Sequence, residues 1–138
     1  MEIVFSGLGK LSEIENCPEC KQRGFPVKEI TLKNFVQQPL RTYAGFFFCH
    51  NPDCEVVYFN NTAKITIKKD QLNVRVGIKE KEPPRPICYC FGYNIEDLNE
   101  NTVEEIKQKI KEIGCQCEIK NPSGRCCLSD IKDFLNQI

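Results

Sequence analysis

The sequence is poor in the residues on which many enzymes and nucleic-acid-binding proteins depend. Its 138 residues include no tryptophan, a single methionine and a single histidine, His50. It contains no Ser/His/Asp set and no Gly-rich phosphate loop, so it predicts a protein that is not an enzyme. Its 19 basic and 19 acidic side chains cancel to a formal net charge of zero. Because no basic, aromatic-rich patch stands out, nucleic acid is not expected as a partner.

The sequence also lacks a membrane span and an N-terminal secretory signal. Its longest apolar run, residues 43–49, is far shorter than the about 20 residues that a membrane helix requires. Residues 1–15 have no basic n-region, no long apolar core and no small-residue cleavage site. These absences predict a cytoplasmic protein that does not insert into membranes.

Cysteine, by contrast, is abundant, with ten residues in the chain. Small domains bury too little apolar surface to be comfortably stable unaided, so disulfides or metal ions are expected to add stability. In a reducing cytosol, closely spaced cysteines are more often metal ligands than disulfides, although hyperthermophiles do contain intracellular disulfides. Metal binding is therefore the first interpretation.

The first half of the chain has the composition of a small β domain. Runs rich in Val, Ile, Phe, Tyr and Thr, separated by turn residues, predict strands at residues 45–49, 56–59, 63–67 and 72–78. Residues 63–68 and 72–76 alternate apolar with polar positions and predict a hairpin with one solvated face. Residues 31–37 predict one or two helical turns that begin at a Thr31 cap.

The character of the sequence changes after residue 78. The charged, proline-containing stretch at residues 79–86 predicts a linker, which places the domain boundary between residues 80 and 81. Beyond it, a helix is expected from a Thr102–Glu105 capping box to a stop at Gly114. A second helix is expected from about Leu128 to the end. The apolar stripes of these two helices are Val103, Ile106, Ile110 and Ile113, and then Ile131, Phe134, Leu135 and Ile138.

Two cysteine pairs in the first half have the spacing of a zinc-binding domain. Cys17 and Cys20 form a CxxC knuckle, and Cys49 and Cys54 form a second pair with four residues between them. Two such pairs on separate loops build a closed tetrahedral thiolate site, which predicts a structural Zn²⁺ ion. A thioredoxin-like redox CxxC and disulfides remain as alternatives. His50, the neighbour of Cys49, is expected to face solvent.

The six other cysteines lie in the second half of the chain. Cys88-Tyr89-Cys90 precedes the first expected helix, and GCQCEIKNPSGRCCL, residues 114–128, contains the other four. A CxC suits two ligands on one iron, or a wide metal site, better than a chelating disulfide. The helix start expected near Cys127 would offer N–H donors and positive dipole to an anionic iron–sulfur cluster.

These segments resemble a known family. ICYCFGYNIEDL and CQCEIKNPSGRCCLSDI resemble the 2Fe-2S module of the bacterioferritin-associated ferredoxin type, in the form found at the N-terminus of CopZ-type copper chaperones. CPEC and FFFCHNPDCEVVYF are similar to the zinc-binding domain that precedes the cluster in those chaperones. The resemblance implies an α+β fold. A zinc-ribbon-like antiparallel β domain is expected over residues 1–80, and a small helical 2Fe-2S domain over residues 81–138.

The resemblance also implies the ligands of both centres. Zn²⁺ is expected on Cys17, Cys20, Cys49 and Cys54, and the 2Fe-2S cluster on Cys88, Cys90, Cys117 and Cys127. Cys115 and Cys126 are then left over. We expect them to be small buried hydrophobes near the cluster, with a soft Cu(I) site as the alternative. The family's C-terminal MxCxxC copper loop has no counterpart in this sequence, so copper delivery by this chain itself is not implied.

The function that the resemblance implies is one-electron transfer linked to copper handling. A metal-binding redox protein of this kind would reduce Cu(II) to Cu(I) for a copper chaperone domain or a copper-transporting ATPase. The resemblance does not identify the electron donor. Two alternatives stay open, a ferredoxin-like electron-transfer subunit of an oxidoreductase and a zinc-ribbon redox sensor.

Overall fold

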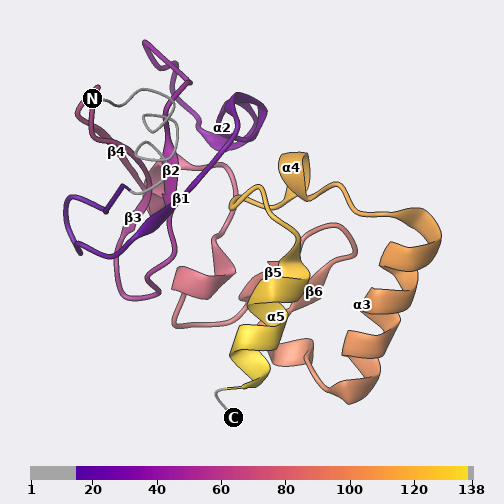
Figure 1. Ribbon diagram of the computed structural model, residues 1–138. Coiled ribbons are helices and arrows are strands. Elements are labelled where there is room, and N and C mark those ends of the chain that lie inside the picture. The colour runs from indigo at the N-terminus through magenta and orange to yellow at the C-terminus, as the bar shows by residue number, and fades with distance from the viewer. Residues whose placement is uncertain (1–14, 137–138) are drawn as a thin grey trace, which may run out of the picture. The chain divides into compact units, whose positions relative to one another are not determined.

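The computed structural model describes residues 15–136, which form an α+β fold in two compact units (Figure 1). The first unit extends to Asn73 and the second begins at Val74. The first unit contains β1 (Gly24–Pro26), α2 (Glu29–Phe35), β2 (Phe47–Cys49), β3 (Val56–Asn60), β4 (Ile65–Lys68) and the 3-10 helix η1 (Lys69–Gln71). The second contains η2 (Gly77–Lys79), β5 (Pro86–Cys88), β6 (Tyr93–Asn94), η3 (Ile95–Asp97), α3 (Glu100–Ile113), α4 (Cys117–Lys120) and α5 (Cys127–Leu135).

The first unit is built on a four-stranded antiparallel sheet in the order β1-β2-β3-β4. Every residue of β3 is buried, because this strand pairs on both sides. Phe47 of β2 lies opposite Phe59 of β3, and their rings stack with centroids 5.7 Å apart. The sheet that the sequence predicted is confirmed for the strands at residues 45–49, 56–59 and 63–67.

The predicted hairpin between residues 63–68 and 72–76 is wrong. β4 pairs with β3, and residues 72–76 lie in no strand; Leu72 forms an isolated bridge with Val36. Leu72 is 5% exposed, so its burial beside the end of α2 replaces strand pairing. The helix predicted at residues 31–37 exists as α2, but Lys28 precedes it and Thr31 lies buried inside it instead of capping it.

The segment predicted to be a linker belongs to the second unit. η2 packs against β5, and the N–H of Ile95 donates to the carbonyl of Arg85 at 2.7 Å. Gly77 lies so close to β5 that a Cβ atom there would be 1.8 Å from the Pro86 carbonyl oxygen. The structure therefore divides the chain between Asn73 and Val74, several residues before the boundary between residues 80 and 81 that composition indicated.

Two helices and a two-stranded sheet enclose the core of the second unit. Its buried residues are Ile87, Cys88, Ile95, Val103, Ile106, Cys127 and Ile131. Asn99, not Thr102, is the N-cap of α3, while Thr102 returns the hydrogen bond to the Asn99 N–H. Gly114 ends α3 with a positive φ of 90°, as expected, whereas Ile113 is 76% exposed and does not join the apolar stripe.

The ends of the chain carry two further expectations. The absence of a secretory signal was inferred from residues 1–15, and Ile138 was placed in the stripe of α5, but residues 1–14 and 137–138 lie outside the described part of the structure. Within residues 15–136, no helix combines the length and apolar character needed to cross a bilayer.

Candidate metal centres

The four cysteines predicted to bind zinc come together in the first unit. The sulfurs of Cys17, Cys20, Cys49 and Cys54 all lie within 4.8 Å of one another. Cys17 Sγ is 3.9 Å from Cys54 Sγ, and Cys20 Sγ is 3.6 Å from Cys49 Sγ. Zinc–thiolate bonds of about 2.3 Å in a tetrahedron place sulfurs about 3.8 Å apart. The donor set therefore fits a closed tetrahedral Zn²⁺ site.

Local backbone structure positions these sulfurs. In the knuckle, the Lys21 N–H donates to the Cys17 carbonyl at 2.9 Å, and Lys21 takes a positive φ of 68° that closes the turn. In the second pair, Cys49 ends β2, and the Asn51 side chain accepts from the Asp53 N–H at 3.0 Å. Both loops are held by backbone or side-chain hydrogen bonds of their own, which fix the directions of the four sulfurs.

The surroundings of Cys20 favour its thiolate. Burial raises the pKa of Cys20, but hydrogen bonds from the Gln22 N–H, Asn51 and Cys49 outweigh burial and bring the pKa to about 7. Burial raises the pKa of Cys54 above its ordinary value. Because zinc binds thiolates, loading the site must release the remaining thiol protons.

Contrary to the expectation, His50 does not face solvent. Its half-buried ring lies edge-on to the rings of Phe25 and Phe48, with centroids 5.7 and 6.2 Å away. In the part of the chain that the structure describes, the donor group around Cys17 contains only cysteines. The imidazole thus packs on the aromatic side of the sheet, and the ligand set is built from sulfur alone.

The four cysteines expected to hold iron lie in the second unit. Cys88 ends β5, and Cys117 and Cys127 begin α4 and α5. Cys90 Sγ lies 3.7 Å from Cys117 Sγ, and the Cys127 side chain is close enough to those of Cys88 and Cys117 to shift the pKa of both thiols. Cys88, Cys117 and Cys127 are at most 4% exposed, and Cys90 is half-buried. The contacts link each cysteine of the CxC motif to a cysteine of the later segment.

This second set is held by backbone donors as well as by its own thiols. The Gln116 N–H donates to Cys90 Sγ at 3.2 Å. The hydrogen bond from Cys127 lowers the pKa of Cys117 to about 5 and that of Cys88 to about 7. The same contacts raise the pKa of Cys127, and burial raises the pKa of Cys90 to about 11. The contacts within this set thus shift the pKa values of its thiols in opposite directions, and a bound metal centre would deprotonate all four.

A buried polar turn at residues 121–125 joins α4 to α5 and sets the positions of the later cysteines. The Asn121 carbonyl oxygen of the side chain accepts from both the N–H and the hydroxyl of Ser123, each at 3.0 Å. The Asn121 amide donates to the Arg125 carbonyl at 3.1 Å, and Gly124 has a positive φ of 72°. Sequence reasoning missed this role, although the Asn-Pro-Ser-Gly run is a turn signal.

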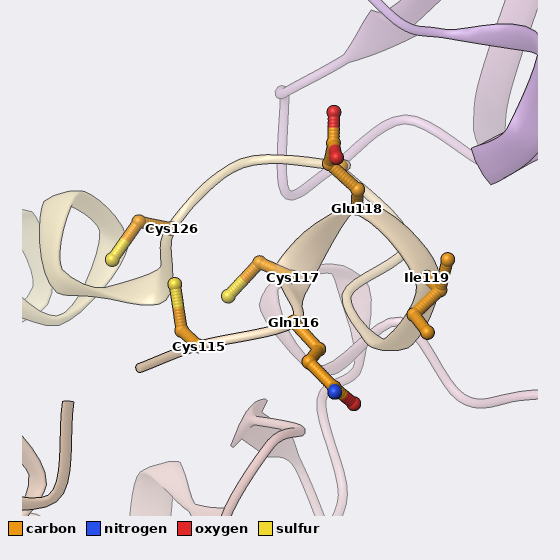
Figure 2. Close-up of a pocket in the computed structure, with 7 residues that line it drawn as sticks. Cys115, Gln116, Cys117, Glu118, Ile119 and Cys126 are labelled. Atoms are coloured by element: carbon orange, nitrogen blue, oxygen red, sulfur yellow. The ribbon is translucent and has the colours of Figure 1, made fainter. Parts of the chain in front are cut away.

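The two leftover cysteines are more accessible than expected. Cys115 is exposed and Cys126 is half-buried, so the interpretation of both as buried hydrophobes is wrong. The sulfurs of Cys115, Cys117 and Cys126 lie within 4.8 Å of one another. Figure 2 shows the sulfurs of all three turned toward a common space, in a pocket that Glu118 and Ile119 also line.

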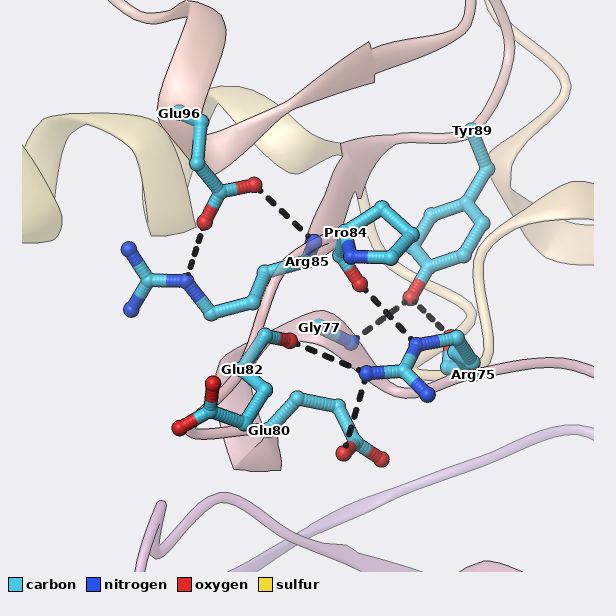
Figure 3. Close-up of polar contacts among 8 residues, drawn as sticks. All are labelled: Arg75, Gly77, Glu80, Glu82, Pro84, Arg85, Tyr89 and Glu96. Atoms are coloured by element: carbon cyan, nitrogen blue, oxygen red, sulfur yellow. Dashed lines mark hydrogen bonds and ion pairs between the residues drawn. The ribbon is translucent and has the colours of Figure 1, made fainter.

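Tyr89, between the two cysteines of the CxC motif, anchors that motif to the start of the second unit. Its hydroxyl donates to the Arg75 carbonyl at 2.7 Å and accepts from the Gly77 N–H at 3.1 Å (Figure 3). Arg75 in turn donates to the carbonyls of Glu82 and Pro84 at 3.0 and 2.9 Å. Burial raises the pKa of Tyr89, so the hydroxyl keeps its proton for this contact. No motif in the sequence indicates this role of Tyr89.

Comparisons with known proteins agree with this architecture. The model of the CopZ-type zinc-binding domain matches residues 14–73, which end where the first unit ends. The crystal structure of the N-terminal domain of Archaeoglobus fulgidus CopZ matches 87% of this chain and 97% of its own, with 31% identity and a TM-score of 0.66. The chain belongs to the CopZ N-terminal domain family. The A. fulgidus copper chaperone CopZ itself is 40% identical over 118 residues.

The CopZ-type match accounts for different parts of the chain to different extents. The zinc-domain model covers the first unit, and the structural match extends across the second unit as well. The chain spans 57% of the length of the A. fulgidus chaperone, and the aligned residues are 80% of this chain. The four cysteines Cys17, Cys20, Cys49 and Cys54 therefore lie in a CopZ-type zinc-binding domain.

Proposed function

We propose that this CopZ-type chain is a two-centre metal protein in which a structural Zn²⁺ ion stabilises the first unit and a 2Fe-2S cluster in the second supports one-electron transfer to copper. Cys88, Cys90, Cys117 and Cys127 would hold the cluster. The relationship to a copper chaperone supports copper handling. The protein would act as a carrier and not as an enzyme.

The observation that carries the proposal is the second thiol set. Iron–sulfur clusters in proteins are held by four cysteine thiolates in sites largely protected from water. Here four sulfurs form one chain of contacts, and two of them, Cys88 and Cys127, belong to the hydrophobic core. Four thiols gathered at one place in and beside this core are the donor set that a cluster needs, which supports a ligand role over a purely packing one.

A bound cluster would supply a one-electron redox couple, and the protein's own groups would set its surroundings. The Gln116 N–H already reaches Cys90, and, after the contact with Cys127, the backbone of Phe91 and Cys90 helps to lower the pKa of Cys88. Hydrogen bonds to cluster sulfurs and solvent exposure tune the potential of such centres. Cys127 begins α5, so its sulfur lies at the positive end of that helix.

The Zn²⁺ centre would not take part in electron transfer. A tetrahedron of four cysteines leaves no open coordination position, and zinc has no redox chemistry of its own. We propose a copper chaperone domain or a copper-transporting ATPase as the partner, in the cytoplasm, without nucleic acid as a ligand. This assignment rests on the chaperone relationship.

Metal analysis of anaerobically purified protein tests the proposal. The expected result is one zinc and about two iron atoms per chain, visible absorbance in the oxidised form, and an S = 1/2 EPR signal after reduction. Stoichiometric reduction of added Cu(II) by the reduced protein, at one copper per electron, would support the copper role. Colourless protein that contains only zinc would contradict the cluster and the electron transfer together.

A further inference from the structure

Lys109 of α3 is held beside the CxC motif by two aromatic rings. Its ammonium lies 5.0 Å from the centroid of the Tyr93 ring and 5.7 Å from that of Phe91, and it donates to the Tyr93 hydroxyl at 2.9 Å. A cation within about 6 Å of a ring face is attracted by the charge distribution of the ring. Lys109 is half-buried, whereas Lys111 on the same helix is exposed. The position of the Lys109 charge is therefore fixed by specific contacts.

The two rings belong to the segment that directly follows the CxC motif. Tyr93 of β6 lies opposite Cys88 of β5, and opposite residues of an antiparallel pair project to the same face of the sheet. The Gly92 N–H donates to the Cys88 carbonyl at 2.8 Å, and Gly92 takes a positive φ of 79°, which turns the chain back at this point. Phe91 and Tyr93 both pack against the buried core residues that include Cys88. The Lys109 charge therefore lies close to a candidate cluster ligand.

The groups around Lys109 keep it ionised. The hydrogen bond with Tyr93, and then the charges of Glu105 and Cys88, raise the pKa of Lys109 above its ordinary value. The Tyr93 hydroxyl in turn donates to the Glu105 carboxylate at 2.9 Å. Because Glu105 is exposed and Lys109 is half-buried, water and salt screen the carboxylate more than the ammonium. The stronger field at Cys88 is therefore that of the positive charge.

We propose that the Lys109 ammonium stabilises the reduced state of the 2Fe-2S cluster and so raises its reduction potential. The inference rests on the proposed function, because it requires a cluster on the cysteines of the second unit. Four thiolates around an oxidised core of about +2 carry a net charge of about −2, and reduction makes this charge about −3. A fixed positive charge nearby favours the more negative state. No bond forms or breaks in this step: one iron gains an electron, and a one-electron donor such as a reduced viologen dye loses it.

The experiment measures the reduction potential of the anaerobically purified, metal-loaded full chain and its variants. Lys109→Met removes the charge and keeps an apolar stem on the two rings, and Lys109→Arg keeps the charge. Lys111→Met is the matched control, because it removes the same charge from an exposed position on the same helix. Absorbance and EPR give the ratio of reduced to oxidised cluster against viologen dyes of known potential. Iron content and thermal unfolding are measured on each sample.

The sign of each shift follows from the charge that is removed. At a fixed ambient potential, the ratio of reduced to oxidised cluster should fall about three- to tenfold in Lys109→Met, and tenfold is about 59 mV for a one-electron couple. Lys109→Arg and Lys111→Met should stay within about twofold of the wild-type ratio. Glu105→Gln should raise the ratio, because it removes the opposing negative charge and keeps an acceptor for the Tyr93 hydroxyl.

Each outcome decides the proposal. A lower potential in Lys109→Met with unchanged iron supports it. An unchanged potential with the cluster intact overturns it and leaves the proposed function standing, and an equal fall in Lys111→Met overturns it because net charge alone would then be the cause. If Lys109→Met loses its iron, Glu105→Gln decides: a raised potential supports the proposal and an unchanged one overturns it. Wild-type protein without iron overturns both this proposal and the proposed cluster.

Discussion

Tyr89 shows how one side chain positions the CxC motif at residues 88–90. Its hydroxyl joins the carbonyl of Arg75 and the N–H of Gly77, and its backbone lies between the two cysteines of the CxC. The two partners belong to a segment with little regular structure, so the phenol supplies hydrogen bonds that a strand would otherwise provide. The start of the second unit therefore depends on a residue that is not itself a ligand.

Replacement of Tyr89 by Phe should loosen this segment without changing the cysteine sulfurs that are the candidate ligands. The Gly77 N–H would lose its partner, and we expect the second unit to be destabilised by about 1–3 kcal/mol. Hydrogen exchange of amides in residues 74–90 measures the change. The control is Tyr93→Phe, because the Tyr93 hydroxyl contacts the charged side chains of Glu105 and Lys109, and its loss leaves no backbone N–H without a partner. Equal effects of the two variants would contradict the role given to Tyr89.

Glu96 provides the clearest dependence of stability on pH outside the cysteines. The Arg85 side chain and then its N–H hydrogen-bond to the Glu96 carboxylate and hold the pKa of Glu96 below its ordinary value of 4.5. A pKa that is lower in the folded state stabilises the fold above the unfolded pKa, and this stabilisation is lost as pH falls through the folded pKa. Glu96→Gln should therefore destabilise the second unit at neutral pH.

The difference between Glu96→Gln and wild type should disappear in acid. Circular dichroism measures the unfolding of both proteins from neutral pH to below 4.5, and the quantity of interest is the difference in their free energies of unfolding. Because acid releases metal from both proteins alike, metal loss does not contribute to this difference. Glu104→Gln is the matched control, since that exposed carboxylate makes only an i,i+3 ion pair with Lys107 at 3.7 Å. A Glu96 effect that is independent of pH would exclude the ion pair as its cause.

At the level of single residues, spacing predicted the sulfur chemistry better than it predicted accessibility. The four zinc candidates could be named because CxxC knuckles impose a turn that points both sulfurs to one side. For Cys126 and Cys127 the sequence alone could not decide, because neighbouring side chains diverge and their burial depends on where α5 begins. The structure starts α5 at Cys127, which buries that sulfur and leaves Cys126 at the cavity.

Among the elements, β5 depends on a close approach by the preceding 3-10 helix. A Cβ atom at Gly77 would be 1.8 Å from the Pro86 carbonyl oxygen, and backbone atoms cannot move aside as a flexible side chain can. Gly77→Ala should therefore displace η2 or β5 and destabilise the second unit by about 1–3 kcal/mol or more. Because β5 ends at Cys88, metal bound by the second set should also be lost faster.

Gly24→Ala is the counterpart of this variant in the first unit. Its Cβ atom would be 2.6 Å from the ring of Phe59, so this change should disturb the sheet that carries Cys49. Thermal unfolding with iron and zinc analysis distinguishes the two variants. We expect Gly77→Ala to affect the second set of cysteines and Gly24→Ala the first. Full retention in Gly77→Ala of the iron proposed for the second unit would show that β5 tolerates the displacement.

The sequence predicted long periodic elements well and short ones poorly. α3 and α5 follow from apolar spacing, and Gly114 correctly marks the end of α3. The predicted hairpin at residues 63–76 is wrong because the alternation of apolar and polar residues indicates which face of a strand is buried and does not identify the strand with which it pairs. Leu72 satisfies the pattern by bridging to Val36. α4 spans four residues and depends on the Asn121 turn, so it had no periodic signal.

On the scale of the whole molecule, each unit has its own core and its own sulfur set. Cys17, Cys49 and Cys54 belong to the core cluster of the first unit, with Phe47, Val56 and Phe59. Cys88 and Cys127 belong to the core cluster of the second. A core that contains its metal ligands couples metal binding to folding, because a missing ion leaves like-charged or unpaired sulfurs in an apolar interior.

Loss of zinc should therefore unfold one unit and spare the other. Structural zinc sites contribute about 10–16 kcal/mol at neutral pH, which matches or exceeds the about 5–15 kcal/mol of a whole domain. We expect Cys49→Ser to lose zinc and to expose the amides of residues 15–73 to rapid hydrogen exchange, with protection kept in α3 and α5. Cys88→Ser should do the reverse, and Glu19→Ser, in the exposed part of the knuckle, should change neither. Faster hydrogen exchange across both units in either cysteine variant would contradict this prediction. It would mean that the two cores unfold together, so that loss of metal from one unit also destabilises the other.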